Sequence, residues 1–174
     1  KLSSSKEHLP FPVFLTGNIE KHELYEIPIN IMLKDNADDI RDKILNFKIH
    51  PLIDEIRNEC DAITKKYTGG HIREPKKLSY DELAIRCDSV FIALHGRPGE
   101  DGTVQKELVK RDIPYNGSRP ESSEITINKF ETNEKLRKNG FHVADHAFVL
   151  KKDWNESQKA FYEEIESRFN YPFI

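Results

Sequence analysis

The sequence predicts an α/β protein in which helices flank an open, parallel-type sheet, followed by the start of a second, α+β unit. Two observations lead to this prediction. Residues 89–94 form an unbroken apolar run, which is typical of a strand buried on both faces of a parallel sheet. A glycine-rich loop, an amphipathic helix and a second short apolar segment at 113–116 follow it. This order is expected of a strand–helix–strand unit.

The chain length indicates one domain and the beginning of another. With 174 residues, the chain can bury one good core and still start a second. We predict a first domain over residues 1–118 and a second over 119–174, cut short at the chain end. The terminal Tyr171-Pro172-Phe173-Ile174 resembles a strand that has just begun, and the chain starts without Met. Both features lead us to expect a piece of a longer protein.

The composition argues against several classes of partner. Hydrophobic residues make up 37% of the chain, charged residues 33%, and the formal net charge is −3, whereas nucleic-acid-binding proteins usually carry a clustered basic face. No run approaches the roughly 20 apolar residues of a membrane-spanning helix, and no apolar signal segment follows Lys1. Cys60 and Cys87 lie in apolar helical patterns. We therefore expect two buried thiols, neither a disulfide nor a metal pair, and a cytoplasmic setting.

The first part of the chain is expected to form two strands and two helices. Residues 12–15 and 24–33 have the apolar character of strands. Asn36 predicts the N-cap of a helix, and Pro51 predicts the first turn of the next one, which Thr68-Gly69-Gly70 would end. Apolar residues recur three and four positions apart, so one face of each helix is expected to be buried: Ile40, Ile44 and Phe47 in the first, and Leu52, Ile56, Cys60, Ile63 and Tyr67 in the second.

Two short helices are expected on either side of the apolar run. Ser79 predicts the cap of one, and the other is expected over residues 102–111. Spacings of four place these side chains inward: Leu83, Cys87, Val104 and Leu108.

The last part is expected to alternate between helix and strand. A helical segment begins at Ser122 and ends at Asn139-Gly140, and residues 142–150 are expected to form a strand. In a strand, His142 and His146 would lie roughly 13 Å apart, too far to chelate one metal ion. Asn155 and Gln158 resemble a capping box that opens a final helix with these apolar residues on one face: Phe161, Ile165 and Phe169.

The loop after the apolar run carries the most distinctive chemistry in the sequence. Loops at the carboxyl ends of parallel strands form ligand crevices, and glycines allow the backbone to approach closely. Phosphate-binding loops gather backbone N–H groups and often a lysine, whereas this loop has two carboxylates at the helix start. We therefore expect a crevice wall that faces a cation. The loop reads His95-Gly96-Arg97-Pro98-Gly99-Glu100-Asp101-Gly102.

The polar residues of this loop receive different predictions. Asp101 is expected to cap the helix, whose dipole stabilises a carboxylate there by about 0.3–1 kcal/mol. Pro98-Gly99 directs Glu100 beyond the helix, where its carboxylate would suit a substrate ammonium or a catalytic lysine. His95, at the strand end, could hydrogen-bond a carboxylate or carbonyl in the same crevice.

Three motifs in order make a family resemblance specific. Residues 91–103, followed by Gln105, contain the pattern H-G-x-x-G-E-D-G. Residues 113–118 read Ile-Pro-Tyr-Asn-Gly-Ser, and residues 127–129 read Ile-Asn-Lys. These segments resemble the H-G-x-x-G-E-D-G, I-P-Y-x-G-S and M-D-K stretches of the D-alanine–D-alanine ligases, which are ATP-grasp carboxylate–amine ligases. The resemblance runs from about Leu83 to the chain end and corresponds to the family's N-terminal portion.

The resemblance implies roles for individual residues. The family's loop glutamate supports a lysine near the reacting phosphate and falls on Glu100, which is thus the implied catalytic residue. Its loop histidine contacts substrate and falls on His95. The lysine of its M-D-K stretch helps to bind the phosphates of ATP and falls on Lys129. Residues 1–118 would form the pre-ATP-grasp, substrate-side domain, and residues 119–174 would begin the ATP-grasp domain.

The resemblance also implies an overall reaction. ATP and magnesium phosphorylate an amino-acid carboxylate, and the amine of a second amino acid attacks the acyl phosphate, which yields D-alanyl-D-alanine for peptidoglycan. ATP and magnesium would be held mainly by residues beyond 174, with no metal ligand in this chain, so we expect these 174 residues alone to be inactive. The implied partners are small molecules such as D-alanine, with no nucleic acid and no membrane. A homodimer is compatible with this interpretation.

The sequence leaves two alternatives open. Residues 16–78 match no stretch of the family pattern, and no role passes to Glu20 from the family glutamate that binds the first substrate's ammonium. The chain could therefore be a non-catalytic interaction domain with a ligase-like fold, or part of an ATP-grasp ligase with other substrates.

Overall fold

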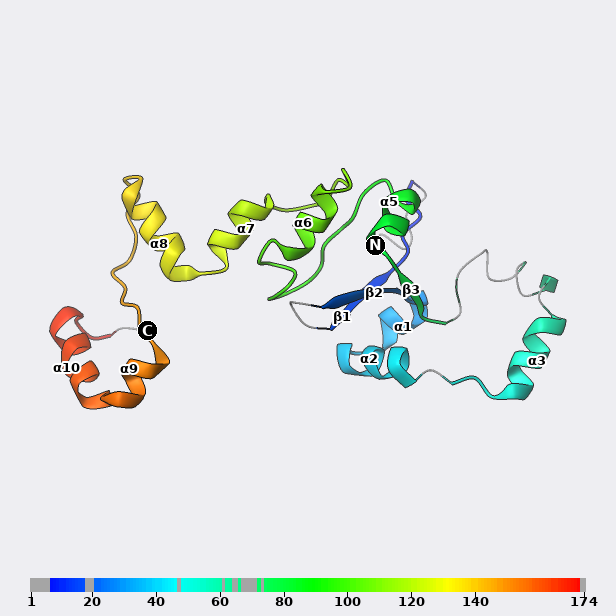
Figure 1. Ribbon diagram of the computed structural model, residues 1–174, viewed down its shortest axis with the longest axis horizontal. Helices are drawn as coiled ribbons and strands as arrows, with labels where there is room; N and C mark the ends of the chain where they lie inside the picture. The colour runs from blue at the N-terminus through cyan, green and yellow to red at the C-terminus, as the bar shows by residue number, and fades with distance from the viewer. Residues whose placement is uncertain are drawn as a thin grey trace. The chain divides into compact units, whose positions relative to one another are not determined.

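The computed structural model describes residues 7–17, 21–46, 48–60, 62–63, 66, 72 and 74–172. Helices and one small sheet are the regular elements of the described part of the chain, so the α/β class is confirmed (Figure 1). The chain divides into two compact units, Lys1–Phe91 with Glu107–Tyr115 and Ile92–Lys106 with Asn116–Ile174. No described helix is both long and apolar enough to cross a bilayer.

The sheet of the first unit is antiparallel. Its strands are β1 (Val13–Gly17), β2 (His22–Glu26) and β3 (Lys76–Leu78), in the order β1-β2-β3. Leu24 lies opposite both Leu15 and Leu78. The predicted open parallel-type sheet is therefore wrong for the described residues. The reason lies in the connection between β1 and β2, because residues 18–21 are far fewer than the dozen or more that a parallel crossover requires.

The apolar run at 89–94 forms only one parallel contact. Val90 pairs with Tyr115 in an isolated bridge, and the N–H of Val90 donates to the carbonyl of Pro114 at 2.8 Å. Phe91 is 69% exposed, so the predicted strand buried on both faces is wrong, as is a regular strand at 113–116. An apolar run becomes a buried strand only if neighbours pair with it, and Pro114 has no N–H to extend the ladder. The parallel direction of this bridge is as predicted, and a helix lies between its two partners in the sequence.

The segment predicted as one strand over residues 24–33 divides into two elements. β2 ends at Glu26, and α1 (Ile29–Lys34) begins after Pro28, whose carbonyl accepts from the N–H of Ile31. Pro28 has no N–H to continue the ladder of β2, and this local effect outweighs the apolar pattern. The core here consists of Ile27, Ile31 and Ile40, packed against Phe14, Tyr25 and Ile44.

Two predicted helix starts in the first unit are confirmed, but one predicted burial is wrong. Asn36 caps α2 (Ala37–Asn46), where its Oδ1 accepts from the N–H groups of residues 38 and 39 at 2.9 and 3.0 Å. α3 (Pro51–Glu59) begins at the predicted proline, yet its apolar stripe is not core-facing, because Leu52 and Ile56 are 56% and 49% exposed. Periodicity shows what a helix can bury, and a packing partner decides whether it does. Phe47, Tyr67 and the stop at 68–70 lie outside the described residues.

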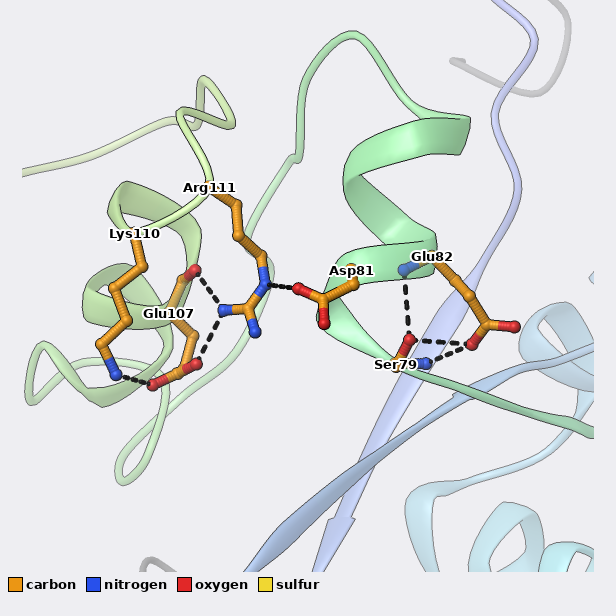
Figure 2. A network of polar contacts seen from close by, with 6 residues as sticks. All are labelled: Ser79, Asp81, Glu82, Glu107, Lys110 and Arg111. Atoms are coloured by element: carbon orange, nitrogen blue, oxygen red, sulfur yellow. Dashed lines mark hydrogen bonds and ion pairs between the residues drawn. The ribbon is translucent and has the colours of Figure 1, made fainter.

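α5 (Tyr80–Arg86) has the predicted cap. The Ser79 hydroxyl accepts from the N–H of Glu82, whose carboxylate accepts in return from the Ser79 N–H, a complete capping box (Figure 2). Leu83 is buried. Cys87 follows the helix and, like Cys60, is a half-buried free thiol. Burial raises the pKa of the Cys87 thiol, which keeps it protonated at neutral pH.

α6 (Thr103–Val109) has the predicted inner face, because Val104 and Leu108 are both buried. Arg111, just beyond its end, links the C-terminal end of α6 to the start of α5 (Figure 2). The guanidinium donates to the Asp81 carboxylate at 2.5 Å, to the Glu107 carboxylate at 2.8 Å and to the Glu107 carbonyl at 3.0 Å. Lys110 donates to the other carboxylate oxygen of Glu107.

The second unit contains two helices where the sequence predicted one segment. α7 (Pro120–Thr126) and α8 (Lys129–Lys138) are separated at Ile127-Asn128. Asn128 accepts hydrogen bonds from the N–H groups of residues 130 and 131, which starts α8 anew. The predicted stop is confirmed, since Gly140 has φ +81° and the N–H of Phe141 donates to the carbonyl of Leu136.

The predicted strand at 142–150 is wrong, because these residues have no regular structure. No strand of the described chain pairs with them, and the segment instead packs on α8 through Phe130, which contacts His146 and Phe148 at ring-centroid distances of 5.2 and 5.0 Å. The spacing of a strand therefore does not set the distance between His142 and His146.

The helical C-terminal segment is confirmed, with a different cap. α9 (Lys151–Glu156) precedes α10 (Gln158–Arg168), and Ser157 caps α10 in place of Asn155 by accepting from the N–H of Ala160 at 3.4 Å. The final strand does not begin at Tyr171, since residues 171 and 172 form a bend. The last two residues lie outside the described part.

Candidate functional site

The glycine loop of the second unit is closed by its own glutamate. The backbone N–H of Glu100 donates to the carbonyl of Gly96 at 2.8 Å. The Glu100 Oε2 atom accepts from the N–H of Gly96 at 2.6 Å. Two hydrogen bonds between the same two residues therefore define the turn, and one carboxylate oxygen is held by the backbone.

His95 lies beside this carboxylate and is open to solvent. Its Nδ1 is 3.8 Å from Glu100 Oε1, and the two side chains are 100% and 50% exposed. Water screens an ion pair at such exposure, so the contact contributes little to stability. The imidazole and the second carboxylate oxygen are accordingly accessible to a ligand.

Two glycines give the loop its shape. A Cβ on Gly99 would lie 2.3 Å from the Cβ of Leu94, and one on Gly102 would lie 2.6 Å from the carbonyl oxygen of Pro120. Gly102 also has φ +88°, a conformation that disfavours residues with a side chain. The loop can therefore approach Leu94 and Pro120 only with glycine at these positions.

Asp101 has the structural role that the sequence predicted. Its Oδ1 accepts from the N–H of Thr103 at 3.0 Å, at the start of α6. The side chain is 9% exposed, with Arg97 Nε 3.9 Å away. The two neighbouring carboxylates of the loop therefore differ. Asp101 accepts a hydrogen bond at the start of α6, whereas the Glu100 side chain is half exposed.

A cavity of about 530 Å³ lies within the second unit. Glu100 and Lys129 both line it, so the structure places two of the three predicted site residues at one cavity although they are far apart in the sequence. His95 is not among its lining residues, but its Nδ1 is 3.8 Å from the Oε1 atom of Glu100, which does line the cavity. Other lining residues come from the loop 116–118 and from α6 and α7: Gln105, Asn116, Gly117, Ser118, Ser123 and Thr126.

Lys129 is the first residue of α8, directly after the cap. A positive charge at a helix N-terminus is disfavoured by the helix dipole, and no ion partner of Lys129 is found in the described part of the chain. Helix stability therefore explains Asn128 but does not explain Lys129. An exposed cation beside a cavity is chemically suited to a phosphate group.

Two residues with polar contacts at the site received no role from the sequence. Asn116 bridges to the backbone of Ile92, accepting from its N–H at 2.5 Å and donating to its carbonyl at 3.2 Å. Gln105 is 6% exposed, and its Nε2 donates to the Gly99 carbonyl at 2.7 Å. A sequence signal for Gln105 did exist, since it interrupts the inward apolar face defined by Val104 and Leu108.

The described residues differ in how well they suit the two cofactors that the resemblance implies. Lys129 offers suitable chemistry for a nucleotide phosphate. No cluster of three or more His, Cys, Asp or Glu side chains within the described ranges could hold a metal ion. No magnesium ligand is therefore assigned to them.

Comparisons with known proteins support the family resemblance. The family model for the D-ala D-ala ligase N-terminus matches residues 6–118. This match includes residues 16–78, so the expectation that they fit no part of the family is wrong. The D-alanine–D-alanine ligase of Aquifex aeolicus is 42% identical over 87 residues, which are 47% of this chain and 30% of that protein. That of Treponema denticola is 29% identical over 162 residues, which are 89% of this chain and 42% of that protein.

A solved structure gives a weaker likeness. The crystal structure of D-alanine–D-alanine ligase from Aeromonas hydrophila has a TM-score of 0.37 and 30% sequence identity, covering 48% of this chain and 32% of that one. The chain spans less than half the length of the curated relatives that it matches here. Because the family model covers well over half of the 174 residues, this chain belongs to the D-alanine–D-alanine ligase family and corresponds to its N-terminal region.

Proposed function

We propose that the full-length protein containing these residues is an ATP-dependent ligase that joins two D-alanine molecules through an acyl-phosphate intermediate. One observation supports this function above others. Glu100 and Lys129, which come from two separate motifs of the family, line the same cavity in the second unit. A cytoplasmic location, a role in peptidoglycan synthesis and a requirement for magnesium are parts of the same proposal.

Glu100 is proposed to act through its carboxylate charge. One of its oxygens is fixed by the Gly96 N–H, so the carboxylate has a defined orientation before any ligand arrives. The remaining oxygen can accept a hydrogen bond from a cationic group, and a lysine near the reacting phosphate is the partner that the family resemblance implies. Preorganised charges of this kind act on a transition state without further reorganisation.

His95 and Lys129 are proposed to contact the two kinds of substrate. The exposed His95 imidazole can hydrogen-bond an amino-acid carboxylate or carbonyl, and the Lys129 ammonium can balance phosphate charge beside the cavity. ATP, when bound, supplies the phosphoryl group that activates the first carboxylate. Residues beyond this chain are proposed to hold magnesium and most of the nucleotide.

A lysine pair on α8 provides the test of this function. In the full-length protein, ATP-dependent phosphate release is measured with D-alanine and with a panel of other D-amino acids and D-hydroxy acids. Lys129→Ala is expected to raise the KM for ATP about tenfold, which corresponds to about 1.4 kcal/mol of lost phosphate binding. Lys138→Ala, at the exposed opposite end of the same helix, is the matched control and should keep the parental KM.

Each alternative function has its own outcome in this experiment. No phosphate release with any compound in the panel would favour a non-catalytic interaction domain. Release with other acceptors and none with D-alanine would identify a ligase of different specificity. Residues 1–174 alone are expected to release no phosphate, and D-alanine-dependent release by this piece would contradict the proposed division of the site.

A further inference from the structure

Gln105 is a polar side chain on the apolar inner face of α6. It is 6% exposed and lies on the same helix as Val104 and Leu108, which are 5% and 0% exposed. A buried amide is tolerated when it is hydrogen-bonded. Here Nε2 donates to the carbonyl oxygen of Gly99 at 2.7 Å, whereas Oε1 is buried and has no hydrogen-bond partner among the described residues. The donor half of the amide is thus the half that the fold uses.

The bond from Gln105 fixes one particular peptide group. The carbonyl of the Gly99–Glu100 peptide accepts from Gln105, and the N–H of the same peptide donates to the Gly96 carbonyl at 2.8 Å. With both polar atoms held, this peptide plane cannot rotate without breaking a hydrogen bond. The constraint matters because glycine is otherwise the residue with the greatest backbone freedom.

The orientation of this peptide determines where the Glu100 side chain begins. The next residue in the chain after the fixed carbonyl is Glu100 itself, whose Oε2 reaches back to the Gly96 N–H at 2.6 Å. Rotation about the Cα–C bond of Gly99 would turn this peptide and displace the Glu100 Cα, which would break both hydrogen bonds and misalign the Glu100 contact with Gly96. Both Gln105 and Glu100 line the cavity of the second unit.

We infer that Gln105 is a positioning residue, whose amide donor locks the Gly99–Glu100 peptide and thereby sets the direction of the Glu100 carboxylate. The expected effect on turnover rests on the function proposed above. The effect on the loop itself does not depend on that function.

Two substitutions distinguish the hydrogen-bond donor of the Gln105 side chain from its packing in the core. Gln105→Met keeps a similar length and removes the donor. Gln105→Glu keeps the shape, presents only acceptors when ionised, and regains a donor when protonated. Burial raises the pKa of a carboxyl group, so protonation of the introduced acid should begin near neutral pH. Gln158→Glu on the exposed surface of α10 makes the same chemical change away from the site.

The kinetic experiment uses the full-length protein with ATP and D-alanine. At about pH 8, both Gln105 variants should lower kcat about tenfold, the loss expected for one hydrogen bond, while KM for ATP changes less than about twofold. As the pH falls to about 6, Gln105→Glu should regain activity relative to the parent and Gln105→Met should not. Gln158→Glu should follow the parent throughout. Equal pH profiles for the two Gln105 variants, or kcat values within about twofold of the parent, would overturn the inference.

Hydrogen exchange of the same proteins decides the question independently of turnover. Peptides covering residues 95–102 should exchange faster in both variants at pH 8, with α8 unchanged. Parental exchange in this loop would overturn the positioning role, and faster exchange throughout the protein would assign Gln105 to core stability instead. A parent without D-alanine-dependent phosphate release would contradict the proposed function alone, and the exchange result would still decide the role of Gln105.

Discussion

The charged residues around Arg111 in the first unit and those around Glu100 in the second are arranged in opposite ways. Arg111 donates to two carboxylates and a carbonyl, and Lys110 occupies the remaining oxygen of Glu107 (Figure 2). Around Glu100, the histidine is fully exposed and its nearest carboxylate oxygen is 3.8 Å away. The charged atoms of the first group are paired with one another, whereas the imidazole and one carboxylate oxygen of the second group are accessible to a ligand.

This difference separates stabilising charges from charges available for chemistry. The Arg111 network holds the end of α6 against the start of α5, and the hydrogen bonds from Lys110 and Arg111 keep the pKa of the Glu107 carboxyl below its usual range. The Glu100 loop contributes less to the fold than its two carboxylates suggest, since only Asp101 serves a helix start. Mutations in the two regions should therefore affect different measurements.

The largest expected effect is on catalysis at Glu100. Glu100→Gln in the full-length protein should lower kcat about a hundredfold, the size of effect seen when a preorganised electrostatic group is removed, with little change in Tm because the side chain is half exposed. Asp101→Asn is the adjacent control, because asparagine also caps helices well. The kcat of Asp101→Asn should stay within a few-fold of the parent. A larger loss of kcat for Asp101→Asn than for Glu100→Gln would mean that Asp101, and not Glu100, is the catalytic carboxylate.

Substitutions at two glycines test how much the glycine loop at residues 95–102 contributes to stability. Gly99→Ala should destabilise the protein by about 1–3 kcal/mol, the range for overpacking a filled site, because the new Cβ would clash with Leu94. Gly96→Ala meets nothing within 4 Å and has only its φ of +69° against it, so its cost should be about 1 kcal/mol. Urea unfolding measures both. Equal losses would mean that the contact with Leu94 does not shape the loop.

Tyr80, whose ring centroid lies 5.4 Å from the Arg111 guanidinium carbon, should make the stability of the protein depend on pH in the alkaline range. Burial, followed by the nearby Glu107, raises the pKa of Tyr80 from 10.0 to about 12. Because the folded pKa lies above the unfolded one, this stabilisation is complete below pH 10 and is lost as the pH rises towards 12. Tm should fall over this interval, and it should fall less in Tyr80→Phe. Absorbance at alkaline pH would contradict this account if every tyrosine titrated together near 10.

The smallest effect is expected from a conservative change in the Arg111 network. Arg111→Lys keeps the charge and loses the planar fork that reaches Asp81 and Glu107 together. Tm should fall by a few degrees at most, because the pair with Asp81 is exposed to solvent, and kcat should be unchanged. A large loss of activity with a parental Tm would show that the network is not purely structural.

Local signals in the sequence were reliable where the interaction is local. Asn36 and Ser79 cap helices because their acceptors reach N–H groups two or three residues away. Gly140 ends α8 because it adopts a positive φ. The inward positions of Val104 and Leu108 follow from helical periodicity. In each case the deciding contact lies within one or two turns, where the sequence itself specifies the partner.

Strands and burial were predicted less well because their partners are distant. The apolar run at 89–94 and the segment at 142–150 could become strands only with a neighbour to complete their backbone hydrogen bonds, and the described residues supply a single bridge at Val90. The stripe on α3 has helical spacing but remains exposed at Leu52 and Ile56. Pattern alone therefore showed which surfaces were apolar, and tertiary contacts decided which were covered.

For the candidate site, the sequence by itself determined the family and predicted His95, Glu100 and Lys129 as site residues, because ordered motifs and their spacing are properties of the chain. Only the tertiary structure showed that Glu100 and Lys129 line one cavity and that Gln105 donates to the carbonyl of the peptide before Glu100. The physical reason is the same throughout: a hydrogen bond or cavity depends on where backbone groups lie in space, and the roles of Gln105 and Asn116 exist only once Gly99 and Ile92 have been brought to them.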